Sequence, residues 1–591
     1  MGAVFGIFGH GTRADMEAMA ARLMHRGRGV AIERIGAAGW LGAVADEPAS
    51  RLVVAGEDGL AAHASVYDSG DALARLSTAL HEGAGELERV DGDFALARID
   101  ARANRLTIAC DYFGSFPLYL ARTGAGALLF ASEYKALLAL PGVGAMADRD
   151  MVRYLQHAKR LPAGRTLMRG VWSVQPGSVV TYDADGAVVE ESRYAPIEAT
   201  GAVSDVGEAC GVIRERMERA ALRRAGGDGA LGLALSGGID SIAMAFLFRR
   251  LWPERRILTF TAGTHDEDQE ILTARRVAQA IGSEHREVIT APSMIADELA
   301  RLVWHMEDPY SRSEALQLYE VGRAASEAGL GVLHHAQGAD GLFAGMPKYG
   351  LMDLMRRYPW ARASLQEFYT FTQRGLEPRR VLAKLGVWAK YRGSVPAVPV
   401  VIDSEAPGAV EFPKPGAQYI NRHAAAGYQE GVFQDLHKFE RPFAAFGVEH
   451  RTLNHDMEYV RAAFTIDDRL KIRGGKQKWI FRKAMEPWVP AEFREIPKFP
   501  QRMEANLELA AALDALADKV LSADEVRARG LFEAGAIERL RRADVSRAYS
   551  HEGGMRLWTA IATELWARAF IDLRGEAPTA AGERAVGVAH G

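Results

Sequence analysis

The chain has 591 residues, of which 48% are hydrophobic and 25% are charged. Because a single hydrophobic core stops growing at roughly 250 to 300 residues, two or three domains are expected, and wholesale disorder is excluded. The formal charge of −4, from 72 basic and 76 acidic residues, gives no sign of a nucleic acid or an anionic membrane as partner.

Cysteine usage and the lengths of the apolar runs narrow the class of protein further. The two cysteines, Cys110 and Cys210, cannot make a disulfide framework or a four-thiolate metal site, and they fit a reducing cytoplasm. No run approaches the roughly 18 apolar residues that a membrane span needs. We therefore expect a soluble cytoplasmic enzyme.

The first 197 residues are expected to form a β-rich domain. Short apolar stretches such as 106–110 and 127–131 alternate with turns, a pattern typical of a sandwich that carries a few helices. Residues 198–205 are small and polar and predict a linker. A pattern of Arg, Glu and Ala then indicates a helix that begins near Val206.

The second domain, predicted over 206–574, has the alternation typical of a parallel α/β sheet. Its predicted elements are strand 231–235, helix 242–252, strand 257–261, a helix from Gln269 and strand 331–335. After Met346 the pattern becomes largely helical. Residues 575–591 lack periodicity, and we expect a mobile tail there.

A glycine-containing loop joins the first of these strands to its helix: Ser236-Gly237-Gly238-Ile239-Asp240-Ser241. Backbone N–H groups at such a junction converge on one point, and the helix dipole favours an anion there. The serine hydroxyls can donate to phosphate oxygens, and the Asp240 carboxylate can hold magnesium. An ordinary tight turn is the alternative, but the strand–loop–helix context favours a phosphate-binding loop.

This hexapeptide resembles the pyrophosphate loop of the ATP pyrophosphatase family, in particular of asparagine synthetases and their relatives, which adenylate a carboxylate. Residues 337–345, Gln-Gly-Ala-Asp-Gly-Leu-Phe-Ala-Gly, are similar to the family's second acidic loop. The resemblance extends along nearly the whole chain and implies ATP and Mg²⁺ as cofactors, with Asp240 and Asp340 as metal ligands. Two carboxylates around one metal suit a hard cation. A turn or cap role is the alternative for Asp340.

The resemblance also implies further site residues. Residues 478–482 match the family's Lys-x-x-Leu-Arg helix motif with Phe481 for Leu, although a solvated stripe of cations is the alternative. Lys498 falls where the family carries a lysine that contacts the acyl-adenylate, and a cation is needed where negative charge develops. The candidate catalytic residues are Lys498 and Gln337. The candidate nucleotide-binding residues are Leu235, Ser236, Gly237, Gly238, Asp240, Ser241, Phe260, Gly338 and Lys478.

Three segments invite a functional interpretation with a structural alternative. Glu307-Asp308-Pro309 resembles an acidic segment that lines the family's cleft, and it could equally cap a helix. His334-His335 at a strand end could bind a metal, although a core position is favoured. Residues 448–451 resemble the family's segment ahead of the late helices, but 452–455, Thr-Leu-Asn-His, depart from its Pro-Phe-Leu continuation.

The first half resembles the family's glutaminase domain, of the N-terminal-nucleophile hydrolase type. Its matching segments are Phe5-Gly-Ile-Phe-Gly9, His25-Arg-Gly27, Asp91-Gly-Asp-Phe94, Asp111-Tyr-Phe-Gly114, Pro117-Leu-Tyr119 and Ala131-Ser-Glu-Tyr-Lys135. Active glutaminases of this kind carry a cysteine nucleophile at residue two, whereas this chain has Gly2, and Phe5 stands where the motif places the cysteine. Residues 63–68 replace the substrate motif Asn-Gly-Glu. A domain that cannot release ammonia from glutamine is therefore expected.

The attacking amine must then come from solution or belong to the acyl substrate. Two family branches lack the cysteine in this way, β-lactam synthetases and the macrolactam synthetases that close lasso peptides. Relatives place a glutamate or a tyrosine at the position of Gln337, whose amide cannot act as a base. An α-amine with a pKa near roughly 8 is already partly neutral, so Gln337 favours an α-amine nucleophile.

We therefore expect a lasso peptide cyclase, which joins an Asp or Glu side chain of a precursor peptide to its N-terminal α-amine. Residues 346–447 are rich in aromatic and basic positions, and part of this segment is expected to bind the peptide, although a helical core explains most of the aromatics. A leader peptidase and a leader-binding protein are further candidate partners. The alternatives are a β-lactam synthetase, an ammonia-dependent asparagine synthetase, and a degenerate synthetase that only binds other proteins.

Overall fold

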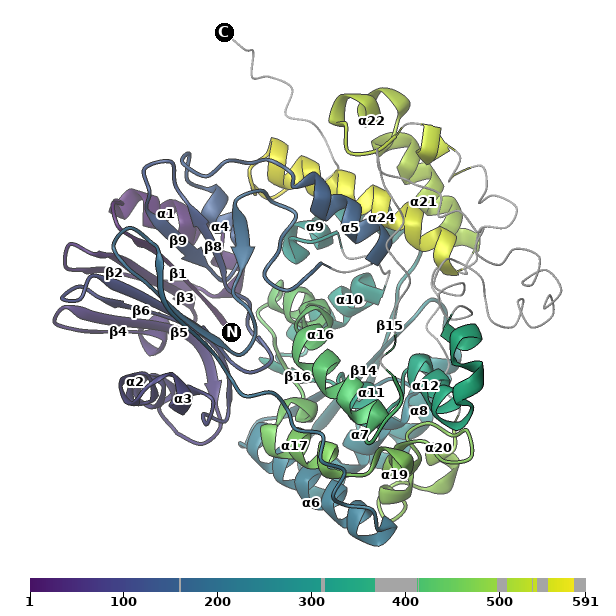
Figure 1. Cartoon of the computed structure of the whole chain (residues 1–591). Coiled ribbons are helices and arrows are strands. Elements are labelled where there is room, and N and C mark those ends of the chain that lie inside the picture. The colour runs from purple at the N-terminus through teal and green to yellow at the C-terminus, as the bar shows by residue number, and fades with distance from the viewer. Residues whose placement is uncertain are drawn as a thin grey trace.

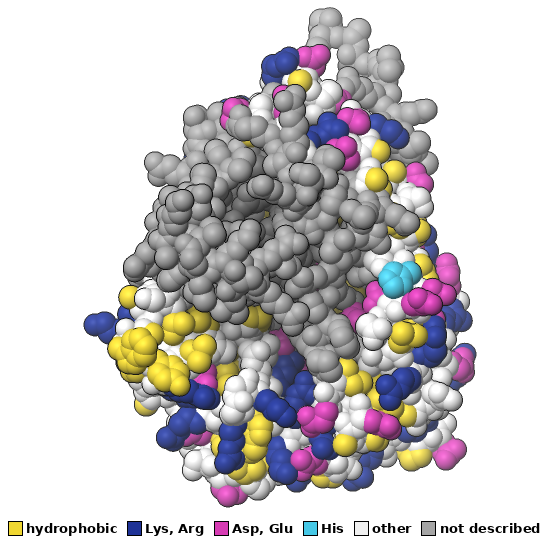
Figure 2. Space-filling model, turned by 90° about the vertical axis from the view of Figure 1, so that its right-hand side faces the viewer, with side chains coloured by type: hydrophobic (Ala, Val, Ile, Leu, Met, Phe, Trp, Pro, Cys, Tyr) yellow, Lys and Arg dark blue, Asp and Glu magenta, His cyan; other side chains and the backbone are white. Residues whose placement is uncertain are grey.

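The computed structural model describes residues 1–158, 161–309, 314–366, 412, 414–496, 507–533, 535–538, 541 and 551–578. The β-rich half and the half with the parallel sheet lie side by side, and helices α21, α22 and α24 from the end of the chain lie across one end of both (Figure 1). On the described part of the face in Figure 2, basic and acidic side chains are interspersed.

The first domain is built from two six-stranded antiparallel sheets. In spatial order the first sheet contains β10 (Val171–Ser173), β8 (Tyr119–Arg122), β9 (Leu128–Ala131), β1 (Gly2–Phe8), β3 (Gly39–Ala45) and β2 (Gly29–Ile35). The second contains β12 (Val188–Arg193), β11 (Ser178–Tyr182), β7 (Arg105–Cys110), β6 (Gly92–Asp100), β5 (Asp58–Val66) and β4 (Leu52–Ala55).

Alternation of side chains along these strands places the core between the two sheets. Val4 and Phe8 of β1 pack there against Ile99 and Ile108 from the opposite sheet. Helices cover the outer faces: α1 (Arg13–Ala21) and α4 (Tyr134–Leu138) lie on the first sheet, and α2 (Ala72–Glu82), followed by α3 (Ala84–Leu87), lies on the second. The expected β-rich sandwich is confirmed.

The segment predicted as a linker runs extended between the domains. It lies between β12 and helix α6 (Val206–Arg224), which begins at the predicted residue because the Asp205 side chain accepts the N–H of Glu208. The linker is held to the second domain, since Gly201 N–H donates to Phe464 O and Val203 forms a bridge with Ile466.

The second domain contains a five-stranded parallel sheet, as predicted. Its spatial order is β15 (Glu284–Ile289), β14 (Ile257–Gly263), β13 (Leu231–Ala234), β16 (Val332–His334) and β17 (Glu449–Arg451). The edge strands β15 and β17 were not predicted. Alternating charged residues such as Glu284 and Arg286 make β15 look like a surface segment, because an edge strand needs no continuous apolar run.

Helices cover both faces of this sheet. Leu258, Phe260 and Leu333 pack on one face with α10 (Glu314–Glu327) and α16 (Tyr419–Ala444). Leu231 and Ile257 pack on the other with α6, α7 (Ile239–Leu251) and α8 (Gln269–Ile281). Further helices of this domain are α9 (Met294–Met306), α11 (Ala339–Leu342), α12 (Pro347–Arg357), α17 (Met457–Thr465), α18 (Asp468–Lys471), α19 (Trp479–Ala484) and α20 (Ala491–Arg494).

A third hydrophobic cluster joins the two domains. Helices α1, α4 and α5 (Arg149–Ala158) of the first domain pack with α9, α21 (Leu507–Val520) and α24 (His551–Ala567), and α22 (Ala523–Arg529) follows α21. Trp558 and Trp566 are fully buried in this cluster. An apolar interface of this kind favours a fixed relation between the domains.

The described start of the predicted tail differs from a free segment. Gly575 O accepts a hydrogen bond from Trp304 Nε1 at 3.0 Å, and Glu576 pairs with Arg22 at 3.0 Å. Periodicity could not show this, because the contacts come from elements hundreds of residues away. Among the helices that the structure describes, none combines the length and apolarity needed to cross a bilayer.

Candidate active site

The candidate site lies where the order of the parallel sheet reverses. From β13 the chain continues to β14 on one side, whereas β16 lies on the other side of β13. Loops that follow such neighbouring strands diverge and leave a crevice at the carboxyl edge of the sheet. The loop 235–238 follows β13, and the loop before α11 follows β16, so both predicted acidic loops meet here.

The serine hydroxyls of the first loop bond within the loop itself. Ser241 Oγ lies 2.9 Å from Ser236 O and 3.0 Å from Gly238 O, and it accepts the N–H of Ser236 at 3.1 Å. Ser236 Oγ accepts the N–H of Gly238 at 3.3 Å. The hydroxyls therefore shape the loop at the start of α7, and the backbone amides remain the groups best suited to phosphate.

Lys478 connects the two predicted metal ligands. Its Nζ contacts Asp240, and it lies 2.5 Å from Asp340 Oδ1. Burial lowers the pKa of Lys478, but the two carboxylates outweigh burial and raise that pKa, so the side chain is charged. One buried cation thus lies between two carboxylates from different loops. Lys478 precedes α19 rather than lying inside it, which differs from the predicted helix motif.

The backbone around this contact is unusual. Ala344 and Lys478 both have φ of 55°, a left-handed conformation that side chains other than glycine rarely adopt. A Cβ on Gly345 would lie 2.1 Å from both Asp340 Oδ1 and Lys478 Cε, so a larger residue there would displace these two side chains. Gln477 Nε2 donates to Ala344 O at 3.1 Å and holds this turn. Gln477 was not predicted.

The turn that carries Gln337 is held by side chains of a neighbouring turn. The carbonyl oxygen of Gln337 accepts hydrogen bonds from Thr452 Oγ1 at 3.1 Å and Asn454 Nδ2 at 3.0 Å. Gly338 has φ of 103°, and a Cβ there would lie 2.5 Å from the hydroxyl of Tyr428 in α16. Thr452, Asn454 and Tyr428 were not predicted, because their role depends on contacts between distant segments.

Other predicted residues take different places. Leu235 and Phe260 are buried in the hydrophobic core beside the loop, where Leu235 N–H donates to Phe260 O at 2.8 Å. Arg482 donates to the carbonyl of Arg494 and does not join Lys478. Lys498 lies outside the described residues.

The residues present fit a magnesium ion. Asp240 Oδ1 is buried and has no hydrogen-bond partner among the described residues, although a carboxylate oxygen in such a place needs a cation or a donor. No group of three or more His, Cys, Asp and Glu that could hold a metal occurs in the described part. Two carboxylates are nevertheless sufficient, because Mg²⁺ keeps several waters and substrate phosphate oxygens as ligands.

Gly237→Ala should separate the fold of the loop from its ligand. A Cβ on Gly237 would meet Thr273 Cβ at 3.4 Å, an ordinary contact, so the variant should unfold within about 2 °C of the unaltered protein. Because glycine lets the backbone amides of the loop approach a phosphate closely, the added methyl group should nevertheless weaken ATP binding about tenfold or more. Isothermal titration of ATP and thermal unfolding test this. Unchanged ATP affinity would contradict the phosphate assignment.

The paired histidines are core residues, as favoured. His334 Nδ1 lies 3.0 Å from Gly232 O, and burial lowers its pKa to about 4. His335 stacks on Phe439 with ring centroids 3.9 Å apart and lies 3.2 Å from His450 Nδ1. Their ring nitrogens have protein partners, so a metal role is not supported.

Glu307 ends helix α9 and connects the domains. Its carboxylate accepts the backbone N–H groups of Tyr134 at 2.9 Å and Lys135 at 2.6 Å, at the start of α4. The same carboxylate lies 3.2 Å from Arg441 Nη2. Within the predicted acidic segment, Glu307 therefore forms an interdomain contact. Its position at the end of α9 agrees with the helix-cap alternative rather than with a place in the cleft.

Asp308, the next residue, should make stability depend on pH. Burial raises the pKa of Asp308 to about 7, and its Oδ1 has no hydrogen-bond partner among the described residues. An unfolded aspartate titrates near roughly 4, so the folded chain binds this proton more tightly and loses stability as pH rises from about 4 to about 7. Asp308→Asn should be more stable than the unaltered protein at pH 8 and similar to it at pH 4.

Urea unfolding between pH 4 and pH 8 measures this difference. Asp297→Asn, at an exposed position of helix α9, which precedes Asp308, is the matched control and should leave the pH dependence unchanged. Parallel pH profiles of Asp308→Asn and the unaltered protein would show that Asp308 is ionised throughout.

The position of the glutaminase nucleophile is closed. Phe5 is fully buried in β1, paired with Gly42 of β3 and Ala131 of β9. His63 is also buried and stacks on Phe116 with ring centroids 3.7 Å apart, and burial lowers the His63 pKa well below its ordinary value. These two buried side chains stand where the resemblance places the cysteine nucleophile and the substrate motif.

The two cysteines cannot replace the nucleophile. Cys110 is buried in β7 and Cys210 in α6. Burial raises the pKa of both thiols, which lowers the fraction of reactive thiolate. The described first domain therefore presents no activated thiol.

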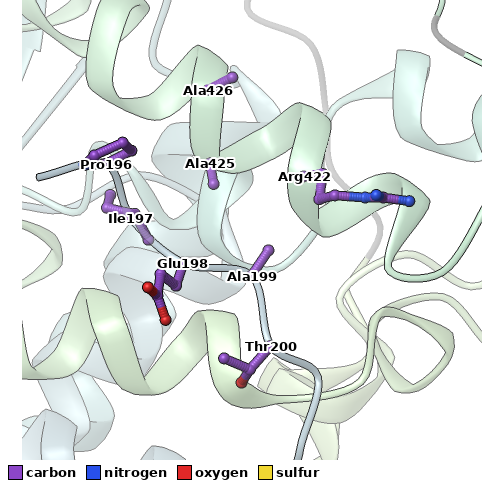
Figure 3. A pocket seen from close by; sticks show the side chains of 8 residues that line it. All are labelled: Pro196, Ile197, Glu198, Ala199, Thr200, Arg422, Ala425 and Ala426. Atoms are coloured by element: carbon purple, nitrogen blue, oxygen red, sulfur yellow. The ribbon is translucent and has the colours of Figure 1, made fainter.

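A cavity of about 440 Å³ opens between the linker and α16 (Figure 3). Its lining residues are Pro196, Ile197, Glu198, Ala199, Thr200, Arg422, Ala425 and Ala426. The α16 wall belongs to the segment 346–447 in which we expect peptide binding. One turn further along the same helix, Tyr428 contacts the turn that carries Gln337.

A glycine-containing strand–loop–helix junction and a second acidic loop at the switch point of a parallel sheet are the arrangement expected of an α/β enzyme that binds a nucleotide. Residues 212–568 match the asparagine synthase family, and residues 62–195 match the glutamine amidotransferase domain. The chain belongs to the asparagine synthase family. It is an ATP-dependent, amide-forming enzyme of that family.

Individual relatives cover different shares of the chain. A Mycobacterium tuberculosis protein, whose name refers to a glutamine-hydrolyzing asparagine synthetase, is 28% identical over 86% of this chain and 81% of its own length. Asparagine synthetase 1 of Bacillus subtilis is 24% identical over 70% of this chain and 68% of its own. Carboxyethyl-arginine beta-lactam-synthase of Streptomyces clavuligerus is 31% identical over 37% of this chain and 39% of its own.

Proposed function

We propose that this enzyme is a lasso peptide cyclase, which closes an amide ring within a peptide. The side-chain carboxylate of an Asp or Glu attacks the α-phosphorus of ATP, which forms an acyl-adenylate and releases pyrophosphate. The peptide's N-terminal amine then attacks the acyl carbon, AMP leaves, and the amine loses one proton. Carboxylate, amine and ATP thus become amide, AMP and pyrophosphate.

The carrying observation is that a complete nucleotide loop is combined with a first domain that holds no activated thiol. Phe5 and His63, which stand at the motif positions of the glutaminase site, are buried, whereas Asp240 and Asp340 both contact Lys478. An enzyme that adenylates a carboxylate but cannot release ammonia must take its amine from elsewhere. An amine on the same substrate is held beside the carbonyl, which raises its effective concentration.

In this proposal the chain's own residues divide the work. The amides of 236–238 bind the pyrophosphate, and Ser236 and Ser241 fix their geometry. Asp240 and Asp340 hold magnesium, which when bound neutralises charge on the pyrophosphate. Lys478 adds a buried positive charge in contact with the same two carboxylates. Lys498 is proposed to contact the transition state, so Lys498→Ala should bind ATP but form no ring.

Gln337 supports an α-amine as the nucleophile. Its side chain cannot remove a proton, and an α-amine needs little help because its pKa lies near roughly 8. The ring-closing rate should therefore rise with pH through this range.

We place part of the peptide in the cavity between the linker and α16, where Glu198 and Arg422 form no ion pairs within the described residues. A leader peptidase, a leader-binding protein and a cytoplasmic location belong to the same proposal.

The test uses the purified chain, Mg²⁺-ATP and synthetic core peptides with an N-terminal Gly and an Asp or Glu several residues later. We expect one AMP and one pyrophosphate per product, whose mass is lower than that of the peptide by one water. The matched N-acetylated peptide should release pyrophosphate without ring closure.

Filling the cavity with Ala426→Trp should raise the KM for peptide and leave ATP affinity unchanged. Pyrophosphate release with none of the peptides would contradict the proposal.

Two other functions have specific support. The β-lactam-synthase relative favours a small-molecule cyclase, which would release pyrophosphate with an amino-acid derivative carrying its own amine. The asparagine-synthetase relatives favour an ammonia-dependent synthetase. Asparagine formed from ATP, aspartate and ammonium salt would establish that second function in place of ours.

A further inference from the structure

Both backbone groups of Gln337, its N–H and its carbonyl, form hydrogen bonds with side chains. Its N–H donates to His335 Nδ1 at 3.3 Å, and its carbonyl accepts from Thr452 and Asn454. A neutral imidazole has one donor and one acceptor nitrogen, so the hydrogen bond that Nδ1 accepts places the ring hydrogen of His335 on Nε2. Asn454 Nδ2 also donates to Ala336 O at 2.9 Å.

This hydrogen-bond chain continues into the first domain. His335 Nε2 lies 3.2 Å from His450 Nδ1, and His450 Nε2 lies 3.2 Å from Ser115 O. With the tautomer fixed by Gln337, every donor in this series faces an acceptor. Burial lowers the pKa of His335 well below its ordinary value and keeps the ring neutral, as the acceptor role requires. Ser115 N–H in turn donates to buried Asp111 at 2.9 Å.

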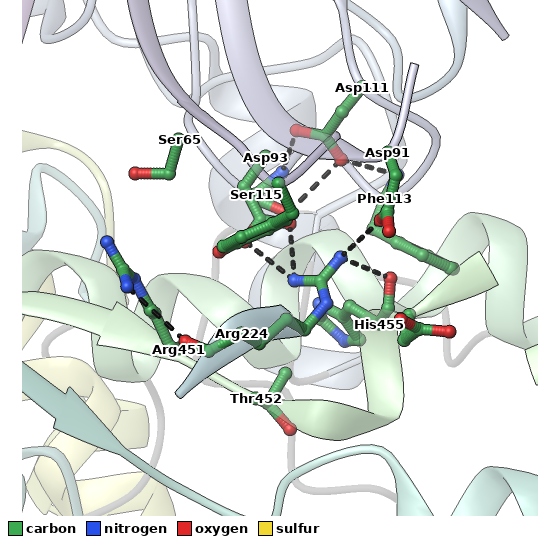
Figure 4. Close-up of polar contacts among 12 residues, drawn as sticks. Ser65, Asp91, Asp93, Asp111, Phe113, Ser115, Arg224, Arg451, Thr452 and His455 are labelled. Atoms are coloured by element: carbon green, nitrogen blue, oxygen red, sulfur yellow. Dashed lines mark hydrogen bonds and ion pairs between the residues drawn. The ribbon is translucent and has the colours of Figure 1, made fainter. Parts of the chain in front are cut away.

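A second set of contacts joins the first domain to the turn 452–455, which supplies Thr452 and Asn454 (Figure 4). Asp93 of β6 accepts two hydrogen bonds from Arg224 Nη1, at 3.1 Å and 2.8 Å, and Arg224 Nη2 donates to His455 O at 2.8 Å. The His455 ring stacks on Phe113 with centroids 4.6 Å apart. The turn 452–455 therefore contacts the first domain on one side and the Gln337 carbonyl on the other.

The turn 452–455 supplies two polar side chains to the acidic loop, the hydroxyl of Thr452 and the amide of Asn454. Both are almost fully buried, at 2% and 4% exposure, so neither donor can be replaced by bulk water. Two buried donors therefore hold one backbone carbonyl of the acidic loop.

We propose that Thr452 and Asn454 are positioning residues for the acidic loop, and that the first domain serves the synthetase site as a brace through His450 and Arg224. The turn they hold leads directly into Asp340, whose carboxylate must face Asp240 for the proposed chemistry. The inference rests on the proposed function for its catalytic consequence. It explains how a domain without its nucleophile still contributes to the reaction.

The kinetic test compares Thr452→Val with Thr452→Ser. Valine keeps the shape and removes the donor, and serine keeps the hydroxyl. We expect Thr452→Val to lower kcat for pyrophosphate release about tenfold, with the KM for ATP within about twofold, and Thr452→Ser to stay near the unaltered protein. Equal kcat in both variants would overturn the proposal.

Asn454→Leu should behave like Thr452→Val, and Asn421→Leu is its matched control. Asn421 is equally buried, but its amide donates to Gln418 Oε1 and Ile466 O, both at 2.8 Å, and not to the acidic loop. Both variants should lose similar thermal stability, and only Asn454→Leu should lose kcat. Equal losses of kcat would show a general folding effect and overturn the assignment.

Hydrogen exchange separates this inference from the proposed function, because it needs no substrate. Amides in 335–345 should exchange faster in Thr452→Val and in His450→Phe, and should be unchanged in Thr452→Ser. Unchanged exchange in His450→Phe would overturn the link to the first domain. Should the unaltered protein release no pyrophosphate with any substrate, the proposed function fails while the exchange result still decides the brace.

Discussion

Asp340→Asn should lower substrate-dependent pyrophosphate release about 1,000-fold or more, while the fold stays intact. The carboxylate follows β16 and faces Asp240 across Lys478. An amide keeps the shape but loses the negative charge that a magnesium ion needs, and the effect corresponds to about 4 kcal/mol of transition-state stabilisation. Steady-state pyrophosphate release under saturating Mg²⁺-ATP measures it.

Stability distinguishes this effect from unfolding. Lys478 keeps its contact with Asp240 in the variant, so the thermal midpoint should move by only a few degrees. Asp266→Asn, at an exposed position after β14 at the same edge of the sheet, is the matched control and should retain full activity. Activity within tenfold of the unaltered protein would remove Asp340 from the metal site.

Arg441→Met should lower the free energy of unfolding by about 3 to 5 kcal/mol, the largest stability loss that we expect from a single substitution in this protein. Arg441 Nη1 lies 2.8 Å from Glu133 Oε1, Nη2 lies 3.2 Å from Glu307 Oε2, and Nε lies 3.4 Å from Glu440 Oε2. All four side chains are at most 1% exposed.

The balance of charge in this cluster explains the size of the effect. Arg26, Lys135 and Arg441 face Glu133, Glu307 and Glu440, three charges of each sign in a buried interdomain contact. Burial alone would raise the Glu133 pKa, but Arg26 and its neighbours hold that pKa well below its ordinary value. Methionine in place of Arg441 would leave three buried carboxylates with two cations.

Arg216→Met is the matched control. Arg216 pairs with Glu458 at 3.0 Å, but the two side chains are 33% and 52% exposed, so we expect a loss below about 1 kcal/mol. Urea unfolding of both variants gives the comparison. Equal losses would mean that the buried network contributes no more than a surface pair, and the two domains would then be joined mainly by the apolar cluster around Trp558 and Trp566.

Much of the architecture could be predicted because it depends on local pattern. A continuous apolar run predicted β13, the alternation of strands and helices predicted β14 and β16, and the hexapeptide was expected at the junction of β13 and α7, where it lies. The edge strand β15 was missed because its charged residues alternate with apolar ones as in an exposed segment. The absence of a thiol at the nucleophile position was predicted from the resemblance to a glutaminase domain together with the residues that stand there.

The contacts between distant segments could not be predicted. Gln477, Gly345 and Asn454 carry no motif of their own, and each is defined by a backbone group that another loop brings within reach. The sequence left Glu307 between a cleft residue and a helix cap, and only the structure shows that it ends α9 and accepts hydrogen bonds from the start of α4.

The sequence by itself determined the class of each domain, because periodicity decides local structure, and its resemblance to a known family predicted the nucleotide loop and the loss of the glutaminase nucleophile. Only the tertiary structure decided that Lys478 joins Asp240 to Asp340, and that Thr452 and Asn454 tie the acidic loop toward the first domain. The physical reason is that hydrogen bonds and ion pairs act over about 3 Å, and only the packing of the whole chain sets which groups come that close.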